Sequence, residues 1–573
     1  MKNKEVAQIF RQIAEILEIQ DQNPFRIRAY LKAAQNIESL PQAVEDLAAK
    51  EALEQIPGIG QDLAEKIKEI VNTGKLKFYQ ELCDNIPEGL TILMSVPGVG
   101  PKTAKTLYDK LNVRSLKHLE QAVSKHQIRD LPGFKEKTEE NIRRGIALVK
   151  KAKERMPLAQ AKAIADEFTG ALAKLKEIKQ IEPAGSLRRK KETVRDIDIL
   201  ITSVRPKKVM DVFTQLPQVK RVLAKGATKS SILSQNDIQV DLRVVEPKSF
   251  GAALLYFTGS TQHNIKLRQL AIKQGLKINE YGVFKNKKWL AGKTEQEIYR
   301  QLKLDPIPAE LREDRGEIEA AQNSALPKLV EFSSIKGDLH LHSRWSDGTV
   351  KIEDLVRSAA AMGYQYIAIC DHSQSIKIAN GLSIDRLKKQ SELIHKINKK
   401  LKGFRILSGS EVDIKSDGSL DYPDRVLKQL DIVVAAIHTG FKQSRQQLTQ
   451  RMISAMENKY VSIIAHPSGR LLAQREPYAL DIEAVLKKAA ETNTFMEISA
   501  FPDRLDLIDV NCRRAQELGV RMSINTDAHT LEHLQFMPLG VTVARRGWLQ
   551  KQDLINTLPL EKLLRAIKQK RDK

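Results

Sequence analysis

The sequence predicts a multidomain protein of mixed α+β and α/β class, with helical domains first and a parallel barrel last. The chain has 573 residues, too many for one core when a domain takes about 100–200 residues. Over residues 1–150, Pro-Gly turns separate short helical patterns. After residue 334, strand-like runs alternate regularly with helical ones, a rhythm typical of a parallel barrel.

Composition and targeting signals indicate a cytoplasmic protein with no membrane segment. Hydrophobic residues make up 42% and charged residues 29% of the chain, proportions typical of folded soluble proteins. No stretch approaches the roughly 18 apolar residues of a membrane span, and the N-terminus lacks a signal-peptide apolar core. The cysteines, Cys83, Cys370 and Cys512, have no CxxC spacing, so neither a disulfide framework nor a thiolate zinc site is indicated.

Positive charge is concentrated in the middle of the chain. The formal net charge is +23, and residues 101–300 hold 42 Lys and Arg against 21 Asp and Glu. Such a concentration is typical of a surface that binds phosphates with salt-dependent affinity. It favours a nucleic-acid partner over a merely soluble basic surface.

An internal repeat in the first 150 residues predicts binding to the DNA backbone. The segments LEQIPGIGQDLAEKIKEIV and MSVPGVGPKTAKTLYDKL each place a Pro-Gly-x-Gly turn before a helix, and RDLPGFKEKTEENIRRGI is a looser third copy. Each resembles a helix-hairpin-helix motif. Glycines Gly58, Gly60, Gly98 and Gly100 would let a phosphate approach free backbone N–H groups at a helix N-terminus. Such contacts hold the backbone without reading sequence.

Three aspartates on two apparent strands predict a first metal centre. Asp196 and Asp198 alternate with isoleucines, so their side chains fall on one face, and Asp241 lies on a second strand, IQVDLRVV. Three such carboxylates can hold two divalent ions about 3.5–4 Å apart for phosphoryl transfer, and Mg²⁺ favours oxygen ligands. A DxD pair alone is also typical of a solvated strand edge. The upstream Gly185-Ser186, followed by arginines, favours a triphosphate site.

Here the chain resembles the family X DNA polymerases, most specifically through LLYFTGSTQHNIKLRQLAIKQGLKINEYGVF. The resemblance implies a nucleotidyltransferase palm and a thumb, with Asp196, Asp198 and Asp241 as the catalytic carboxylates holding Mg²⁺ or Mn²⁺. It implies nucleotide contacts from Arg155, Gly185, Ser186, Arg189, Tyr256, Phe257, Gly259 and Asn264, and a template-strand contact from Arg268. Aromatic core packing is the alternative for Tyr256 and Phe257. The implied reaction adds deoxynucleotides to a primer 3′-hydroxyl at short gaps in repair.

Two departures from the family pattern limit what the resemblance implies. Lys66 aligns with the nucleophile of relatives that excise 5′-deoxyribose phosphate, but Asp62 and Arg26 stand where those relatives carry lysines. An acid nearby would keep Lys66 protonated, so a phosphate-binding lysine is the preferred interpretation. Arg195 stands before Asp196, where a small residue is expected.

Histidines gather in the last part of the chain and predict a second metal centre. Eight of the 11 histidines follow residue 334, most at apparent strand ends in GDLHLHSRWSDG, CDHS, AIHTG, AHPS and TDAH. In a barrel that end carries the chemistry, and neutral imidazole is a good transition-metal ligand. The expected ligands are His340, His342, Asp347, His372, Glu411, His438, His466, Asp527 and His529. We expect His395 and His533 to be surface residues.

This set resembles the PHP (polymerase and histidinol phosphatase) phosphoesterase domain over residues 335–573. The resemblance implies a distorted (βα)7 barrel with three divalent ions, Mn²⁺, Zn²⁺ or Fe²⁺, and removal of 3′-terminal nucleotides or blocking groups. It implies one ion held by His340, His342, Glu411 and Asp527, a second by Glu411, His438 and His466, and a third by Asp347, His372 and His529. Arg470 or Arg504 would stabilise developing charge.

These interpretations divide the chain into six segments. We expect an 8-kDa-like helical DNA-binding domain at 1–80, helix-hairpin-helix fingers at 81–150, a palm at 151–245, a thumb-like nascent-base-pair domain at 246–315, a linker at 316–334, and the PHP domain at 335–573.

The leading hypothesis is a gap-filling family X DNA polymerase with a fused 3′–5′ exonuclease. Its expected partners are gapped or primer-template DNA with 3′ ends and deoxynucleoside triphosphates, and we expect a monomer. One alternative is a small-molecule phosphatase tethered to a DNA-binding module, and another is a non-enzymatic scaffold for DNA ends. The scaffold would have no use for nine metal ligands.

Overall fold

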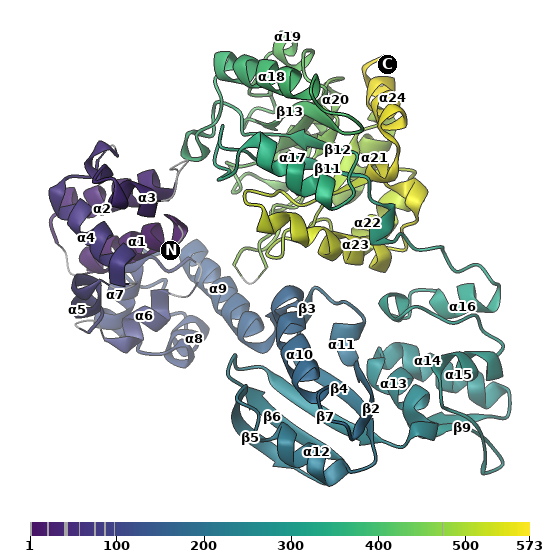
Figure 1. Ribbon diagram of the computed structural model, residues 1–573. Helices are drawn as coiled ribbons and strands as arrows, with labels where there is room; N and C mark the ends of the chain where they lie inside the picture. The colour runs from purple at the N-terminus through teal and green to yellow at the C-terminus, as the bar shows by residue number, and fades with distance from the viewer. Residues whose placement is uncertain are drawn as a thin grey trace.

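The computed structural model describes residues 3–19, 22–38, 44–56, 58–73, 76–84, 87–94, 96, 98–472 and 474–572. Figure 1 shows the N-terminal helices to one side, a sheet with its flanking helices below, and the C-terminal barrel above. The large hydrophobic clusters follow this division, because each draws its buried residues almost entirely from one stretch of the chain.

Two small helical cores form the N-terminal part. The first joins α1 (Asn3–Ile19), α2 (Pro24–Glu38), α3 (Val44–Ala49), α4 (Gln61–Thr73) and α5 (Lys77–Asp84). The second joins α6 (Glu88–Met94), α7 (Pro101–Leu111), α8 (Leu116–Ser124) and α9 (Glu136–Glu154). Helices α4 and α7 each follow a Pro-Gly-x-Gly turn, and Gly58 and Gly98 have positive φ values of +80° and +90°. The two copies of the predicted sequence repeat therefore also share the backbone conformation of the glycine that precedes the helix.

A five-stranded sheet follows, in the order β2-β4-β7-β6-β5. Its strands are β2 (Ile178–Pro183), β4 (Asp196–Ser203), β5 (Val219–Lys225), β6 (Lys229–Ser234) and β7 (Gln239–Val245). Helices α10 (Leu158–Leu172) and α12 (Pro206–Phe213) contribute to the core beneath it. Strands β4 and β7 pair in parallel, while the other pairs are antiparallel. This pairing brings the DxD strand beside the strand of the third aspartate.

The next region combines helices with a small antiparallel sheet. It contains α13 (Phe250–Thr258), α14 (Thr261–Lys273), β8 (Lys277–Asn279), β9 (Gly282–Lys285), β10 (Lys288–Ala291) and α15 (Glu295–Gln301). The segment expected as a linker, 316–334, is folded, because α16 (Glu317–Gln322) buries Ile318 and Ala321 in the core of this region. Val330 then joins the core of the barrel.

The C-terminal part is a seven-stranded parallel sheet whose strands are neighbours in chain order. They are β11 (Gly337–Leu341), β12 (Tyr366–Ile369), β13 (Arg405–Asp413), β14 (Ile432–Ala436), β15 (Ile463–Ile464), β16 (Phe495–Ser499) and β17 (Met522–Asn525). A parallel bridge between Leu341 and Ala528 brings the first strand beside the last. The predicted (βα)7 barrel is confirmed.

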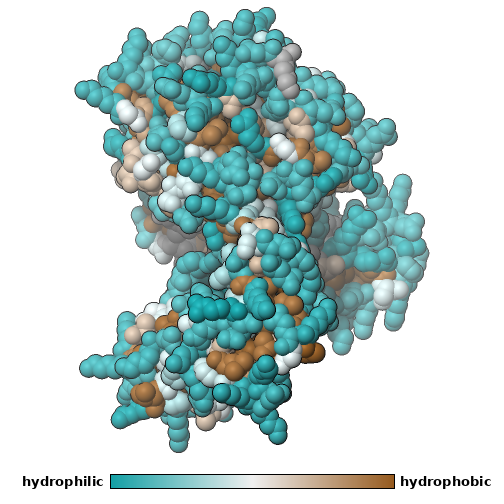
Figure 2. Space-filling view, turned by 90° about the vertical axis from the view of Figure 1, so that its right-hand side faces the viewer, coloured by the Kyte–Doolittle hydropathy of each residue, from teal (hydrophilic) through white to brown (hydrophobic). Residues whose placement is uncertain are grey.

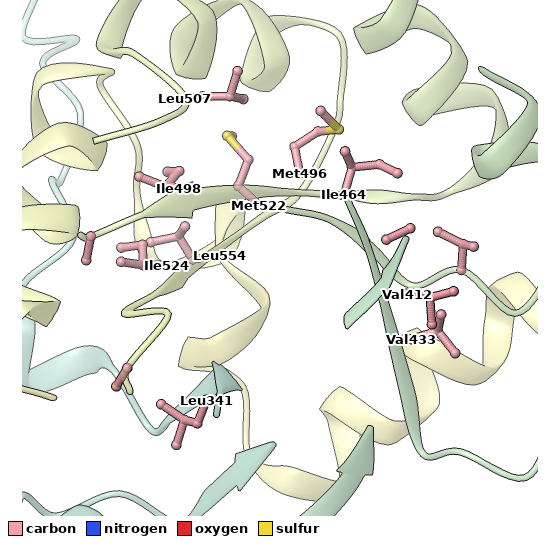
Figure 3. Close-up of a cluster of buried hydrophobic side chains, with 14 of the residues drawn as sticks. Leu341, Val412, Val433, Ile464, Met496, Ile498, Leu507, Met522, Ile524 and Leu554 are labelled. Atoms are coloured by element: carbon pink, nitrogen blue, oxygen red, sulfur yellow. The ribbon is translucent and has the colours of Figure 1, made fainter. Parts of the chain in front are cut away.

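Side chains alternate between the two faces of the barrel sheet. One face packs against the surrounding helices α17 (Ile352–Ala361), α18 (Ile384–Asn398), α19 (Asp424–Leu427), α20 (Arg445–Glu457), α21 (Ile482–Thr492), α22 (Asp509–Glu517) and α23 (Met537–Arg546). Figure 3 shows part of this core, including Leu341, Val412 and Ile498. The other face packs against α24 (Leu560–Arg571). Because both faces of the sheet are packed, the C-terminal ends of its strands are held in place, and polar side chains can converge there.

The surface is mostly polar. Figure 2 shows hydrophilic side chains over most of one face, with smaller apolar groups among them. Within the described ranges, every helix is too short or too polar to cross a membrane.

Two candidate metal centres

The first centre lies on β4 and β7. The register pairs Asp198 with Asp241, and Asp196 stands two residues earlier on the same face of β4. Burial, followed by repulsion from the other two aspartates, raises the pKa of Asp198 to about 6. Lys229 Nζ lies 3.5 Å from Asp241 Oδ2, and Arg195 Nε lies 3.6 Å from Asp196 Oδ2. A carboxylate group of this kind favours bound cations, so the residues fit divalent metal ions.

A glycine is required beside this centre. Gly185 begins the short helix α11 (Gly185–Arg188) with a φ of +61°, and a Cβ there would lie 2.5 Å from Asp198 Oδ2. The main chain therefore lies too close to the Asp198 carboxylate for any side chain at this position. Ser186, the next residue, is half-buried.

The arginines expected near the triphosphate already have protein partners. Arg189 Nε lies 3.0 Å from Glu313 Oε1, and Arg155 donates to the Thr193 hydroxyl at 2.8 Å and carbonyl at 2.6 Å. Arg188 makes a two-pronged ion pair with Glu295 at 2.7 and 2.8 Å, so its charge is neutralised within the protein.

The other residues expected to contact the nucleotide or the template lie where α13 meets α14. Tyr256 and Phe257 lie in an edge-to-face contact with centroids 5.2 Å apart, and Tyr256 is 38% exposed, so it is no core residue. The Arg243 guanidinium lies 4.3 Å above Phe257. Asn264 Nδ2 donates to the Tyr256 carbonyl at 2.7 Å, and Arg268 Nε to the Asn264 carbonyl at 3.2 Å. The α13 C-cap, Gly259, lies close to Arg189.

In the N-terminal part, Lys66 on α4 contacts the Asp62 carboxylate, and its ammonium lies 5.4 Å from the Phe78 ring centroid. Gly60 and Gly100 precede α4 and α7, and a Cβ at either would meet open space. The turns are thus accessible to a phosphate backbone.

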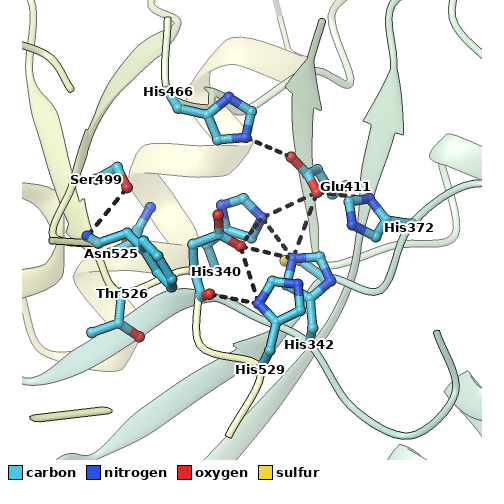
Figure 4. A network of polar contacts seen from close by, with 12 residues as sticks. His340, His342, His372, Glu411, His466, Ser499, Asn525, Thr526 and His529 are labelled. Carbon is cyan, nitrogen blue, oxygen red and sulfur yellow. Dashed lines mark hydrogen bonds and ion pairs between the residues drawn. The ribbon is translucent and has the colours of Figure 1, made fainter. Parts of the chain in front are cut away.

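The second centre lies at the C-terminal ends of the barrel strands. His340 is on β11, Glu411 is on β13, and the other expected ligands lie in the loops that follow the strands. Figure 4 shows His340, His342, His372 and His466 turned toward Glu411. The fold therefore brings together residues nearly 200 positions apart in sequence.

Glu411 lies in the middle of this centre. Its Oε1 is 3.0 Å from His466 Nε2 and 3.1 Å from His438 Nε2, and its Oε2 is 2.9 Å from His372 Nδ1. The same Oε2 lies 3.5 Å from the Nε2 atoms of His340 and His342. A carboxylate shared in this way suits a ligand that bridges two ions.

Asp527 and Asp347 complete the centre. Asp527 Oδ1 lies 3.1 Å from His342 Nε2. Asp347 Oδ2 lies 3.3 Å from His529 Nε2 and 3.5 Å from His372 Nε2. Ligand atoms within 4.8 Å of one another form three groups: His342, Asp347, His372 and His529; His340, His342 and Asp527; and His372, Glu411 and His438. This mixture of imidazole and carboxylate fits divalent transition metals.

The charges of the second centre are strongly coupled. Burial opposes ionisation of Glu411, yet His438, His372 and His340 hold its pKa well below the ordinary value. Burial likewise opposes protonation of His340, but Glu497, Glu411 and Asp527 raise its pKa well above the ordinary value. Three carboxylates so placed attract positive charge, which divalent ions supply when bound.

Two buried carboxylates behind the ligands were missed in the sequence. Glu497 Oε2 lies 2.8 Å from His340 Nδ1, and Asp413 Oδ1 lies 3.2 Å from His438 Nδ1. Such partners fix which ring nitrogen faces a metal. The available signal was an acid in a buried strand pattern: Asp413, two residues after Glu411 in SGSEVDI, and Glu497, the one acid in TFMEISA.

A cavity of about 300 Å³ opens beside the second centre, lined by Asp347, Asp527 and His529. Arg504 also lines it, with its Nε 3.9 Å from Asp527 Oδ2, whereas Arg470 is paired with Glu192 at 2.8 Å. Of the two arginines considered, Arg504 is therefore the one beside the ligands. His533, in the turn before α23, is half-buried and lines the same cavity. His395 is exposed, as predicted.

Comparison with known proteins follows the same division. Family models match as a helix-hairpin-helix domain at residues 1–76, a SAM-like helix-hairpin-helix tandem at 90–147, a DNA polymerase beta thumb at 253–313 and a PHP domain at 338–500. A probable phosphatase of Thermoanaerobacter sp. (strain X514) is 32% identical over 248 residues, covering 41% of this chain and 96% of that protein. A probable phosphatase of Syntrophotalea carbinolica is 29% identical over 230 residues, 38% of this chain and 90% of that protein.

One relative matches from end to end. The DNA polymerase/3′-5′ exonuclease PolX of Bacillus subtilis (strain 168) is 40% identical over 565 residues, which are 98% of this chain and 98% of that protein. With the helix-hairpin-helix, thumb and PHP matches, this implies a DNA substrate and dependence on divalent metal ions. The chain belongs to the family of the bacterial DNA polymerase/3′-5′ exonuclease PolX.

Proposed function

We propose that this protein fills short gaps in DNA during repair and removes nucleotides or blocking groups from 3′ ends. One observation carries the proposal: three carboxylates on β4 and β7 and a cluster of nine candidate metal ligands in the barrel occur in one chain, and 98% of that chain matches a polymerase/exonuclease. The first centre adds nucleotides and the second removes them. Their common substrate is a DNA 3′ end, and we place this work in the cytoplasm.

The first centre holds Mg²⁺ or Mn²⁺ through Asp196, Asp198 and Asp241. The second would hold three ions, Mn²⁺, Zn²⁺ or Fe²⁺, and Glu411 would belong to two of the three ligand sets. Bound divalent ions supply activated nucleophiles and neutralise charge on the reacting phosphate. The proposed ligands of the three ions are His340, His342, Glu411 and Asp527; Glu411, His438 and His466; and Asp347, His372 and His529.

The chain's own residues position the substrates. The deoxynucleoside triphosphate is bound by Arg155, Gly185, Ser186, Arg189, Tyr256, Phe257, Gly259 and Asn264. DNA is bound by Gly58, Gly60, Gly98, Gly100, Lys66 and Arg268. The Lys66–Asp62 contact supports a phosphate-binding role for Lys66 and argues against a nucleophilic one. Arg504 stabilises charge on the phosphodiester being cleaved.

We propose a monomer with DNA-binding helical domains at 1–80 and 81–150, a palm at 151–245 and a thumb-like domain at 246–315. Residues 316–334 connect these to the exonuclease domain at 335–573.

Single substitutions test the proposal by separating the activities. Asp241→Ala should abolish nucleotide addition to a gapped duplex and leave 3′ degradation, because it removes only the first centre. His340→Ala should do the reverse. Each variant is assayed with one deoxynucleoside triphosphate and Mn²⁺, and the activity that survives reports folding. If either substitution removed both activities from a folded protein, two independent centres would be ruled out.

A phosphatase acting on small molecules is the second candidate, because the relatives named probable phosphatases match the barrel alone. Release of phosphate from sugar or amino-alcohol monoesters, without shortening of DNA, would favour it. The complete aspartate centre on β4 and β7 favours the polymerase instead.

A further inference from the structure

The cavity beside the barrel ligands has a second wall that the metal centre does not explain. Asp347, Asp527 and His529 form one side of this space of about 300 Å³. Phe501 and Arg504, from the loop after β16, line the same space. An aromatic ring thus lies next to a group of metal ligands without being able to bind metal itself.

Neighbouring rings hold Phe501 in a defined orientation. The His533 ring meets it edge to face with centroids 5.2 Å apart and an interplanar angle of 88°. Phe536 makes a similar contact at 5.5 Å and 82°. The Phe501 carbonyl accepts the Arg504 N–H at 2.9 Å, so ring and guanidinium belong to one tight turn. A ring fixed on two sides is prepared for stacking at little cost in conformational entropy.

The size and chemistry of the cavity suit one nucleotide. Its volume is at the lower end of the roughly 300–1,000 Å³ typical of small-molecule sites, too small for a base pair together with its backbone. Ile378, 60% exposed, and Leu471 add apolar surface to the wall. Arg504 adds a cation 3.9 Å from Asp527, on the side where a phosphate would meet the ligands. The apolar wall would contact the base of a nucleotide, and Arg504 would contact its phosphate.

We propose that Phe501 stacks on the base of the 3′-terminal nucleotide and makes this cavity the binding subsite for that nucleotide. The inference rests on the proposed exonuclease function. Because every base has a π-face, the subsite accepts all four bases. Phe501 is a positioning residue: it holds the terminal nucleotide so that its phosphodiester lies against the metal ligands and Arg504.

The test compares two protein variants on two substrates. Wild type, Phe501→Ala and Phe501→Trp are assayed for Mn²⁺-dependent cleavage of a single-stranded oligonucleotide with a normal 3′-terminal nucleotide. A second oligonucleotide ends in a 3′-terminal abasic tetrahydrofuran nucleotide. Stacking on one base predicts that Phe501→Ala raises the KM for the normal oligonucleotide about tenfold or more, with a smaller change in kcat. On the abasic oligonucleotide, Phe501→Ala and wild type should behave alike, and Phe501→Trp should retain the wild-type preference for a terminal base.

Two controls separate stacking from structural damage. Phe332→Ala removes a phenylalanine that is 40% exposed outside the cavity lining, and it should cleave both oligonucleotides as wild type does. Gap filling by Phe501→Ala should be unchanged. An equal loss on both oligonucleotides, or no loss on either, would overturn the subsite while leaving the exonuclease intact. Failure of wild type to shorten any 3′ end would instead contradict the proposed function, and the subsite with it.

Discussion

Glu497 orients two of the proposed barrel ligands, His340 and His466, through hydrogen bonds on the side away from the centre. Its Oε2 lies 2.8 Å from His340 Nδ1 and accepts the Asn525 side-chain amide at 2.9 Å. Its Oε1 accepts the His466 N–H at 3.0 Å. One buried carboxylate thereby sets the ring orientation of one ligand and the backbone of another. His340 Nε2 is left facing the centre.

Replacing Glu497 with glutamine should weaken metal binding without removing a ligand. The amide can no longer hold the His340 ring by a charged hydrogen bond, and losses of such partners cost about 10–100-fold in metal affinity. Calorimetric Mn²⁺ titration should show the weaker binding, and the exonuclease should need correspondingly more Mn²⁺. Glu483→Gln, at an exposed ion pair with Arg514, is the matched control. Unchanged Mn²⁺ affinity in Glu497→Gln would show that the hydrogen bond is dispensable.

Gly185 provides a residue-scale test of the first centre. Gly185→Ala places a Cβ 2.5 Å from Asp198 Oδ2 and strains a φ of +61°, so the aspartate must move. Displacements near 1 Å can cost about 100-fold in rate, and nucleotide addition should fall by that order. Gly275→Ala shares the strain, with φ +69°, but its Cβ meets open space. Primer extension should therefore separate the two variants, while exonuclease activity stays normal in both. If both variants lost primer extension to the same extent, backbone strain and not the contact with Asp198 would explain the loss.

At the scale of elements, helix α24 closes the inner face of the barrel and carries a buried lysine. Lys570 Nζ donates to the Met456 carbonyl at 2.9 Å and to the Thr494 hydroxyl. Burial lowers the pKa of Lys570 to about 7. The lysine ties α24 to α20 and to the start of β16, at the expense of burying an ionisable group.

This lysine should make stability depend on pH. From about pH 7 to the ordinary lysine pKa of about 10.4, the unfolded chain carries a proton that the folded chain lacks, so stability rises with pH. Below pH 7 both states are charged and the contribution is constant. Denaturation at several pH values should show that the free energy of unfolding of wild type rises, relative to that of Lys570→Met, by roughly 3–4 kcal/mol between pH 7 and 10. The exposed Lys568→Met should track wild type, and a parallel course for Lys570→Met would refute the assignment.

At the scale of the whole molecule, buried ion pairs join the barrel to the polymerase region. Arg546 on α23 lies 3.1 Å from Glu313 Oε1 and donates to the Arg189 carbonyl at 2.7 Å. It also pairs with Asp509 of its own domain at 2.5 Å. Burial favours neutral Glu313, but Arg189 and Arg546 lower its pKa. A barrel residue thus holds the arginine proposed to bind the triphosphate.

Replacing Arg546 should lower the stability of the contact between the barrel and the polymerase region, and it should weaken binding of the deoxynucleoside triphosphate. Arg546→Ala leaves Glu313 and Asp509 buried with fewer partners, a situation that costs about 3–5 kcal/mol. Denaturation should show the loss, and gap-filling assays should show a higher KM for the deoxynucleoside triphosphate. Arg514→Ala breaks a surface pair and should cost only about 0–1 kcal/mol. Wild-type stability and KM in Arg546→Ala would mean that the domains are not coupled here.

The sequence by itself was enough to predict the class of fold and the residues that gather at each of the two centres. Helical repeats, the alternation of Asp196 and Asp198, and the βα rhythm are local patterns, and local geometry follows from them directly. Strand order then brought His340 and Asp527 together, as a parallel barrel requires.

Only the tertiary structure decided what surrounds those centres. Glu497 behind His340, His533 in the cavity wall and Arg470 directed to Glu192 depend on contacts between segments far apart in the chain. The expected linker at 316–334 is folded because its apolar residues pack on two cores at once. Hydrophobic periodicity indicates which face of a helix or strand is buried. It does not indicate which distant element packs on that face, because that pairing depends on packing between elements and not on any local sequence pattern.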